Sequence, residues 1–351
     1  MMIGLLGART GTGSLRPMEL DASLPPTSLR DIPVLAAAAE AAGFGALWAS
    51  ETQHDPFLPL ALAAEHTQSI RLGTAVAIGF ARSPATLAYT AWDLADASGG
   101  RFILGLGTQV RAHIERRFGM PWPDSPVGQM RELIGAVRAL WACWQTGERL
   151  NFRGERYKLT LMTPFFNPGP IDHPDIPIYI AGVNIGLCRL AGEAADGFHA
   201  HPYHSERYLR EVVRPAIDAG ARAAGRDPQC VRLAVSAFVV TDPGEADFVR
   251  SQLAFYASTP SYRPVMAHHG WGDTADQLAG LSRRGAWDEM GACISDDMLE
   301  TFAVVADPAM VADALRRRYA GLADRLTPYM PYAPGERDAF WRGLAAELKP
   351  S

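Results

Sequence analysis

The chain has 351 residues, 48% hydrophobic and 20% charged, which is the composition of a globular protein with a sizeable core. Its 33 basic and 38 acidic residues are spread along the chain and give a net charge of −5, so we expect no nucleic-acid partner. The apolar start lacks a basic lead and breaks at Arg9, which favours a cytoplasmic protein without a signal peptide or a membrane span.

Short apolar runs alternate with helical patterns from one end of the chain to the other. This alternation is typical of strand–helix units around a parallel sheet, and it predicts an α/β fold: one (β/α)8 TIM-barrel domain over residues 1–351. Helices are expected from Ser28 to Ala42, ending at Gly43, and from Pro84 to Ala97. The strands are expected at about Met2–Gly7, Ala46–Ala49, Ile70–Ile78, Arg101–Leu106, Ile176–Ala181, Gly197–His201, Val231–Thr241 and Arg325–Met330.

Two long segments interrupt this alternation. The first, about residues 120–175 after strand four, contains a predicted helix from Val127 to Gln145 and a hairpin through Leu150 to Lys158. The second, about residues 259–290 after strand seven, is rich in proline, histidine and glycine. Long insertions in a compact barrel are usually lids or binding loops, so we expect the second to cover the site.

The loop after strand two carries Glu51 and His54. Reactive groups of such barrels lie at the carboxyl ends of the strands, and a histidine beside a carboxylate can exchange protons near neutral pH. The alternative is that these polar residues only form the turn before the helix that begins near Pro56.

Two further strand ends are candidates for holding an anionic cofactor. Gly107, Thr108 and Gln109 lead from strand four into a helix, and the run from Ala181 to Asn184 leads from strand five into another. Glycines allow close approach to a ring or a phosphate, and a helix start attracts anions. Arg116 could add positive charge, although an exposed arginine is equally often only solvated.

The histidines of strand six raise the question of a metal. His199 and His201 share one face of the strand and His204 follows, but no carboxylate stands at ligand spacing, so we predict no metal site. The four cysteines form no C-x-x-C pair and are interpreted as reduced structural thiols.

Several segments together resemble the luciferase-like flavin monooxygenase superfamily over nearly the whole chain. Within it, the chain is most similar to an actinobacterial subgroup of coenzyme F420-dependent oxidoreductases. The superfamily segments are Ala41–Trp48 with Glu51 beyond it, Arg71–Val76, Gly99–Gly107 and Ala191–Gly197. The subgroup segments are Glu51–Leu60, Gln109–Phe118, Leu161–Phe166 and His269–Asp273.

The resemblance implies a non-prolyl cis peptide between Ala75 and Val76, against one face of the cofactor ring. It also implies cofactor contacts along the barrel mouth, with the phosphates near Gly182–Asn184 and Arg116. The glucose-6-phosphate dehydrogenase relatives carry an acidic proton donor where this chain has Gln109 and Val110, so their chemistry is not expected here. Glu51, His54 or His113 would handle protons instead. The implied cofactor contacts are Ala8, Ala75, Val76, Gly107, Thr108, Gln109, Arg116, Ala181, Gly182, Val183 and Asn184.

These expectations combine into one functional hypothesis, which is hydride transfer between F420 and an unidentified small organic substrate. The alternatives are an FMNH2-dependent monooxygenase in the same pocket and a flavin-binding protein without catalysis. The resemblance also implies a homodimer, to which Trp92 could contribute, although a core position would explain Trp92 as well. Five aromatic residues could line the pocket or belong to the core: Phe80, Phe165, Phe166, Trp271 and Trp287.

Overall fold

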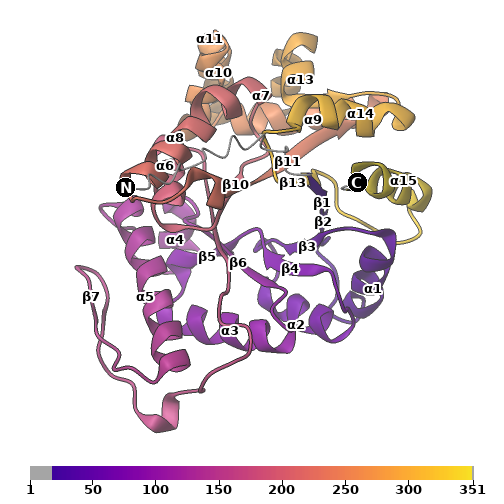
Figure 1. The fold of residues 1–351 in the computed structure, drawn as a ribbon. Coiled ribbons are helices and arrows are strands. Elements are labelled where there is room, and N and C mark those ends of the chain that lie inside the picture. The colour runs from indigo at the N-terminus through magenta and orange to yellow at the C-terminus, as the bar shows by residue number, and fades with distance from the viewer. Residues whose placement is uncertain (1–17, 350–351) are drawn as a thin grey trace, which may run out of the picture.

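The computed structural model describes residues 18–349, and parallel strands at its centre form a barrel surrounded by helices (Figure 1). The path of hydrogen-bonded strands begins at β1 (Glu19–Leu20) and ends at β2 (Ala22–Ser23). Because only Asp21 separates these two, both ends of the path belong to one barrel strand and the sheet closes. The path between them runs through β13 (Arg325–Pro328), β11 (Arg232–Val240), β10 (Gly197–Ala200), β9 (Ile178–Gly182), β6 (Phe102–Gly107), β4 (Arg71–Thr74) and β3 (Ala46–Ala49).

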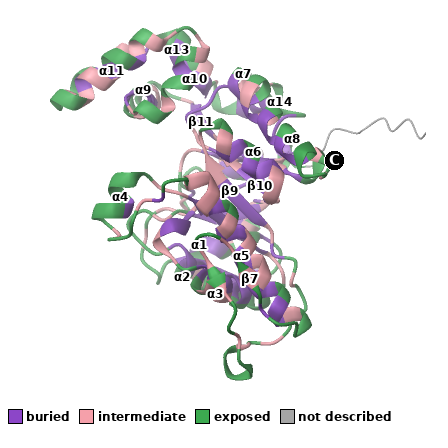
Figure 2. Cartoon of the chain, turned by 90° about the vertical axis from the view of Figure 1, so that its left-hand side faces the viewer, coloured by how far each residue is buried: buried purple, intermediate pink, exposed green. Residues whose placement is uncertain are grey.

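The helices pack their apolar faces on the outside of this barrel, and Figure 2 shows buried residues concentrated in the strands and on the inner sides of the helices. Two predicted helix ends are confirmed. α1 (Ile32–Ala42) ends at Gly43 with a φ of 91°, and Ser83 caps α3 (Pro84–Ala97) by accepting from Thr86 N at 3.1 Å. The remaining barrel helices are α2 (Phe57–Glu65), α5 (Pro126–Thr146), α6 (Ile185–Ala194), α7 (Glu206–Tyr208), α8 (Arg214–Ala223), α9 (Pro243–Ala257), α14 (Val311–Tyr319) and α15 (Asp338–Leu348).

The barrel prediction is confirmed, but the position of its first strand was wrong. Residues 19–23 occupy that place, whereas the segment expected there, Met2–Gly7, lies outside the described residues. The reason is that the barrel interior is polar at this level. Glu19 and Asp21 both contact Arg325 inside the barrel and alternate with the buried residues Leu20 and Ala22, so the strand has no continuous apolar run like those from which the strands were predicted.

The third predicted strand, residues 70–78, is divided into β4 and β5 (Ala77–Ile78). The expected cis peptide between Ala75 and Val76 lies between the two halves. Thr74 bridges β4 to β6 at this break, because its Oγ1 donates to Gly105 O at 2.6 Å and accepts from Gly105 N at 2.9 Å.

The insertion after strand four has the predicted helix and hairpin. α4 (Arg111–Arg116) and α5 precede an antiparallel pair, β7 (Phe152–Arg153) with β8 (Lys158–Leu159). The segment that follows lies against α3, where Tyr89 Oη donates to Phe166 O at 2.6 Å. Trp92 is 1% exposed and packs against two tryptophans of α5, so it is a core residue and offers no surface for a dimer contact.

The insertion after strand seven, which was expected to be a lid or binding loop, is helical. It lies beyond the carboxyl end of β11, at the top of Figure 1. No helix in the described part of the chain combines the length and the apolarity that crossing a membrane requires. The insertion contains α10 (Arg263–His268), α11 (Gly272–Arg284), α12 (Trp287–Met290) and α13 (Asp296–Phe302), and ends at β12 (Ala303–Val305), which pairs with β11.

Candidate active site

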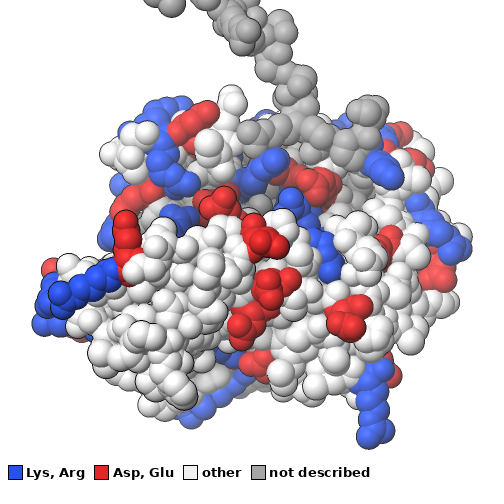
Figure 3. All heavy atoms as spheres, turned by 60° about the horizontal axis from the view of Figure 1, so that its bottom comes forward, with Lys and Arg blue, Asp and Glu red and all other residues white. Residues whose placement is uncertain are grey.

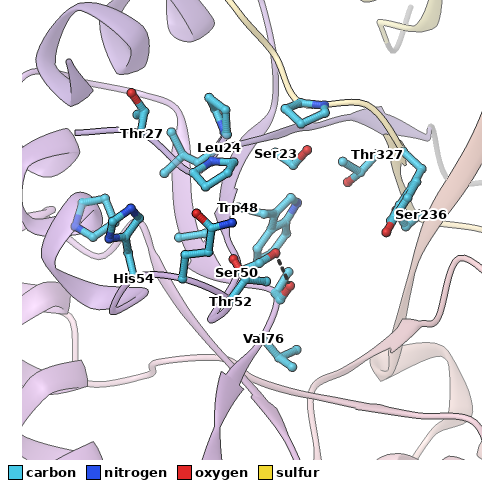
Figure 4. Close-up of a pocket in the computed structure, with 18 of the residues that line it drawn as sticks. Ser23, Leu24, Thr27, Trp48, Ser50, Thr52, His54, Val76, Ser236 and Thr327 are labelled. Atoms are coloured by element: carbon cyan, nitrogen blue, oxygen red, sulfur yellow. Dashed lines mark hydrogen bonds between the residues drawn. The ribbon is translucent and has the colours of Figure 1, made fainter. Parts of the chain in front are cut away.

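A cavity of about 1040 Å³ opens at the carboxyl ends of the barrel strands, the position at which barrel enzymes hold their reactive groups (Figure 4). This volume lies at the upper end of the range for small-molecule sites. We call its inner surface the floor: Trp48, Ala75, Val76, Ala181, His199, His201 and Ala234. We call its outer apolar edge the lip: Leu24, Pro25, Pro26, Leu29, Leu58, Pro59, Phe248, Met330 and Pro331.

A buried ion pair lies beneath the floor. Arg325 donates to both carboxylate oxygens of Asp21, at 2.7 and 2.8 Å, and Trp48 Nε1 donates to the same carboxylate at 2.9 Å. Burial raises the pKa of Asp21, whereas the neighbouring guanidinium acts in the opposite direction. Glu19 is a second carboxylate at 2.8 Å from Arg325, and this network holds Trp48 in place through its bond to Asp21.

Ala75 and Val76 are held in the floor by the segment after β3. Ser50 Oγ donates to Ala75 O at 2.9 Å, and Glu51 Oε2 accepts from Ile78 N at 2.7 Å and from Arg82 at 2.5 Å. Glu51 does not line the cavity. Its carboxylate is therefore placed to support the floor from behind.

His54 and Asp55 lie at the open side of the cavity, and Figure 4 places His54 across from Ser236 and Thr327 with Trp48 between them. Asp55 accepts from Phe57 N at 2.8 Å and pairs with Arg82 at 3.0 Å, so this carboxylate forms the turn that opens α2. The His54 side chain is exposed at the cavity edge, where it can exchange protons with solvent.

The end of β6 lies beside the floor without lining the cavity. A Cβ on Gly107 would lie 2.5 Å from Val76 Cγ2, so only glycine allows this approach. Gln109 has a φ of 59°, and its Oε1 accepts from Val110 N at 2.9 Å. Thr108 Oγ1 donates to Gln109 O at 3.0 Å. His113 and Arg116 are exposed on α4 and do not line the cavity.

The turn from β9 into α6 is only partly in the cavity. Ala181 lines it, while Gly182, Val183 and Asn184 continue along the same turn outside the lining. Asn184 caps α6, because its Oδ1 accepts from Leu187 N at 2.9 Å. The other N–H groups of this helix start are those that could bind an anion. Ala8, the remaining expected contact, lies outside the described residues.

The histidines of β10 line the cavity, although from the sequence they were candidates only for metal binding. His199 Nε2 is buried and has no hydrogen-bond partner within residues 18–349, and its ring packs edge-on against Trp48 at 4.8 Å. Burial lowers the pKa of His199 to about 3, with Arg325 contributing, so the ring is neutral at pH 7. Among the residues the structure describes, no three His, Cys, Asp or Glu side chains are grouped to hold a metal.

His201 is also neutral, because burial and then His204 lower its pKa to about 3. Its Nδ1 accepts from Tyr203 N at 3.1 Å, which leaves the proton on Nε2 as a donor. Tyr329 lines the same cavity, and its hydroxyl lies 2.8 Å from that of Tyr256. Strand alternation placed the histidines on one face, but only the closed barrel shows that this face meets the cavity.

The five aromatic residues considered for the pocket do not line it. Phe80 is buried in the core, and Phe165 and Phe166 are 88% and 62% exposed on the insertion after strand four. Trp271 stacks on His269, and Trp287 is 52% exposed beside Phe255. These five residues lie in the core or on the surface, and the aromatic side chains that do line the cavity are Trp48, Phe248 and Tyr329.

A closed parallel barrel with a mostly apolar cavity at its strand ends defines a barrel enzyme that binds a small molecule. The family described as luciferase-like monooxygenase matches residues 8–325, so the chain belongs to this family and is an oxidoreductase.

Three relatives show the range of similarity. An uncharacterized protein of Mycobacterium tuberculosis is 45% identical over 92% of this chain and 96% of its own length. The 5,10-methylenetetrahydromethanopterin reductase of Methanolobus tindarius is 30% identical over 77% and 81%. The F420-dependent glucose-6-phosphate dehydrogenase of Mycolicibacterium fortuitum is 31% identical over 61% and 66%.

Solved structures share the fold at low identity. The coenzyme F420-dependent tetrahydromethanopterin reductase of Methanopyrus kandleri aligns with a TM-score of 0.76 at 22% identity, covering 94% of this chain and 98% of its own. A long-chain alkane monooxygenase aligns with a TM-score of 0.72 at 15% identity, covering 95% and 92%. Both reductases and oxygenases are therefore built on this barrel.

Proposed function

We propose that the protein is a coenzyme F420-dependent oxidoreductase that transfers a hydride between the deazaflavin and a small organic substrate. The observation that carries this proposal is the floor, in which small apolar side chains surround a buried imidazole whose Nε2 has no partner among residues 18–349. Its named relatives support the choice of cofactor, because one at 31% identity is an F420-dependent dehydrogenase.

The floor fits a deazaflavin ring, which has apolar faces and a polar edge. Ala75, Val76 and Ala181 leave room for the ring, and His199 offers a neutral hydrogen-bonding group. Beside them, Gly107, Thr108 and Gln109 would contact the edge of the cofactor. The phosphates would bind Gly182, Val183 and Asn184 at the start of α6, with Arg116 on α4 as a further cation. When bound, the cofactor supplies the two-electron chemistry.

His54 is the residue we assign to proton exchange, because it is exposed at the cavity edge, whereas Glu51 is engaged by Ile78 and Arg82. His113 is exposed on α4 and does not line the cavity, so we rank it below His54. With a substrate that the wild type turns over, His54→Ala should lower kcat by about 100-fold while F420 affinity stays within about twofold. If kcat survives while the cofactor still binds, His54 has no such role.

A second candidate function is that of an FMNH2-dependent monooxygenase, which the fold of the alkane monooxygenase favours. The two functions differ in the cofactor that the cavity accepts. Titrating the protein with F420 and with FMN, followed by fluorescence, tests them directly. The proposal expects tight binding of F420, and binding of FMN alone would replace it with the second candidate.

A further inference from the structure

A pair of tyrosine hydroxyls lies at the wall of the cavity that β13 forms. Tyr329 directly follows β13, between Thr327 and the lip residues Met330 and Pro331. Its hydroxyl lies 2.8 Å from that of Tyr256, which belongs to α9. Tyr329 lines the cavity and Tyr256 does not, so Tyr256 reaches this hydroxyl from behind the wall.

Both rings of this pair are fixed by their neighbours. Tyr329 N donates to Ala237 O at 2.7 Å, and the Tyr329 ring packs edge-on against Phe238 with 4.7 Å between the ring centres. The Tyr256 ring packs edge-on against His201 at 4.6 Å. A hydroxyl held in this way needs little reorganisation when charge develops beside it.

The direction of the bond between the two hydroxyls follows from counting hydrogens. Only one of the two hydrogens can lie between the oxygens, so the other needs a different acceptor. Within residues 18–349 neither hydroxyl has another hydrogen-bond partner. Burial raises the pKa of Tyr256, so its hydroxyl keeps its proton. The arrangement that leaves no hydrogen buried without an acceptor has Tyr256 donating to Tyr329 and Tyr329 donating into the cavity.

Tyr329 also lies on the wall opposite His54. Figure 4 places His54 across from Ser236 and Thr327, and Tyr329 is two residues beyond Thr327 at the end of the same strand. A molecule in the cavity is therefore flanked by an exposed imidazole on one side and by a hydroxyl donor on the other.

We propose that Tyr329 donates a hydrogen bond to the substrate atom on which negative charge builds during hydride transfer, and that Tyr256 is the positioning residue for this hydroxyl. This inference rests on the proposed function. One atom of a substrate double bond gains a hydride, two electrons and one proton, from reduced F420, which becomes oxidised. The π electron pair moves to the other atom, which then gains a proton that His54 exchanges with solvent. The Tyr329 hydroxyl stabilises the charge on this second atom before the proton arrives.

The kinetic test compares single and double variants with a substrate that the wild type turns over. Tyr329→Phe should lower kcat by about 100-fold while F420 affinity, followed by fluorescence, stays within about twofold. Tyr256→Phe should lower kcat by about tenfold, and the double variant should match Tyr329→Phe, because Tyr256 acts only through Tyr329. An unchanged kcat in Tyr329→Phe would refute the proposal, and losses that multiply in the double variant would refute the positioning role.

Tyr89→Phe is the matched control for the loss of a bonded hydroxyl. Tyr89 is a partly buried residue of α3 whose hydroxyl donates to Phe166 O at 2.6 Å, and it does not line the cavity. This variant should lose stability as Tyr329→Phe does but keep the kcat of the wild type. Equal losses of kcat in the two variants would show an effect on the fold alone and would contradict the donor role.

A second measurement uses the full chain without cofactor. The probe is 4-ethylpyridine N-oxide, which accepts a hydrogen bond but cannot donate one, and ethylbenzene is the matched compound without an acceptor. In calorimetric titration, Tyr329→Phe should weaken the N-oxide about three- to tenfold and ethylbenzene less than about twofold. An N-oxide that fails to bind the wild type, or that binds Tyr329→Phe equally tightly, would overturn the proposal. Because this titration contains no cofactor, failure of F420 to bind would remove the proposed function and leave the hydroxyl donor standing.

Discussion

The histidines around the end of β10 determine how the stability of the protein responds to acid. Burial lowers the pKa of His199 and His201 to about 3 and that of His204 to about 4, below the ordinary value near 6.5. The unfolded chain therefore binds protons first as pH falls, so the free energy of unfolding is at its full value above about pH 6.5 and decreases toward pH 4. Each histidine contributes a slope on the order of 1.4 kcal/mol per pH unit in this window.

Urea unfolding of the wild type and of His204→Gln at several pH values measures this slope. The variant should be less stable at pH 7, because it loses the hydrogen bonds of His204 to His201 O and to Tyr319, yet its stability should fall less steeply with acid. Parallel pH profiles for the two proteins would show that His204 does not titrate in this way.

Glu51 gives a second prediction at this scale. Glu51→Gln removes the ion pair with Arg82 at the segment that supports Ala75 and Val76, and should cost about 2 kcal/mol of unfolding free energy. Glu115→Gln is the matched control, because Glu115 pairs with Arg111 on the exposed surface of α4 and should cost less than about 0.5 kcal/mol. Equal losses in chemical denaturation would contradict a supporting role for Glu51.

The structural elements show what could be predicted from the sequence and what could not. The strands from β3 onward except β12, together with α3, α5 and the hairpin, were predicted from their apolar patterns and capping residues. The first strand was not predicted. Glu19 and Asp21 interrupt its apolar residues, and their place inside the barrel depends on the contact with Arg325, which lies 304 residues beyond Asp21. His54, Ala75, Val76 and Ala181 were predicted near the site, whereas His199, His201 and Tyr329 depend on how the last strands close the barrel.

The contact between β6 and the floor supplies a prediction at the level of elements. Gly107→Ala would bring Cβ to 2.5 Å from Val76 Cγ2 and should destabilise the fold by about 1–3 kcal/mol. Gly343→Ala, within α15, meets no atom within 4 Å and should stabilise by about 0.5–1 kcal/mol. Thermal unfolding of both variants checks these opposite signs, and a Gly107→Ala protein as stable as the wild type would contradict the close approach.

At the scale of the whole molecule, we predict a homodimer. Trp92 is excluded as its contact by burial, whereas Leu161, Phe165 and Phe166 on the insertion after strand four are 78%, 88% and 62% exposed. Acidic and basic side chains are interspersed on the face drawn in Figure 3, so this face has no large patch of one charge sign. Light scattering should give twice the 38.0 kDa of one chain. A mass of one chain at working concentration would contradict the dimer.

The central claim is that F420 binds in the cavity at the barrel mouth, and one titration tests both the cofactor and its place. Ala181→Trp would fill the floor, whereas Ala142→Trp adds the same side chain on the exposed face of α5. F420 should bind the wild type and Ala142→Trp alike and should bind Ala181→Trp about 100-fold more weakly, because overpacking displaces the ring. Unchanged F420 affinity in Ala181→Trp, or binding of FMN in place of F420, would contradict it.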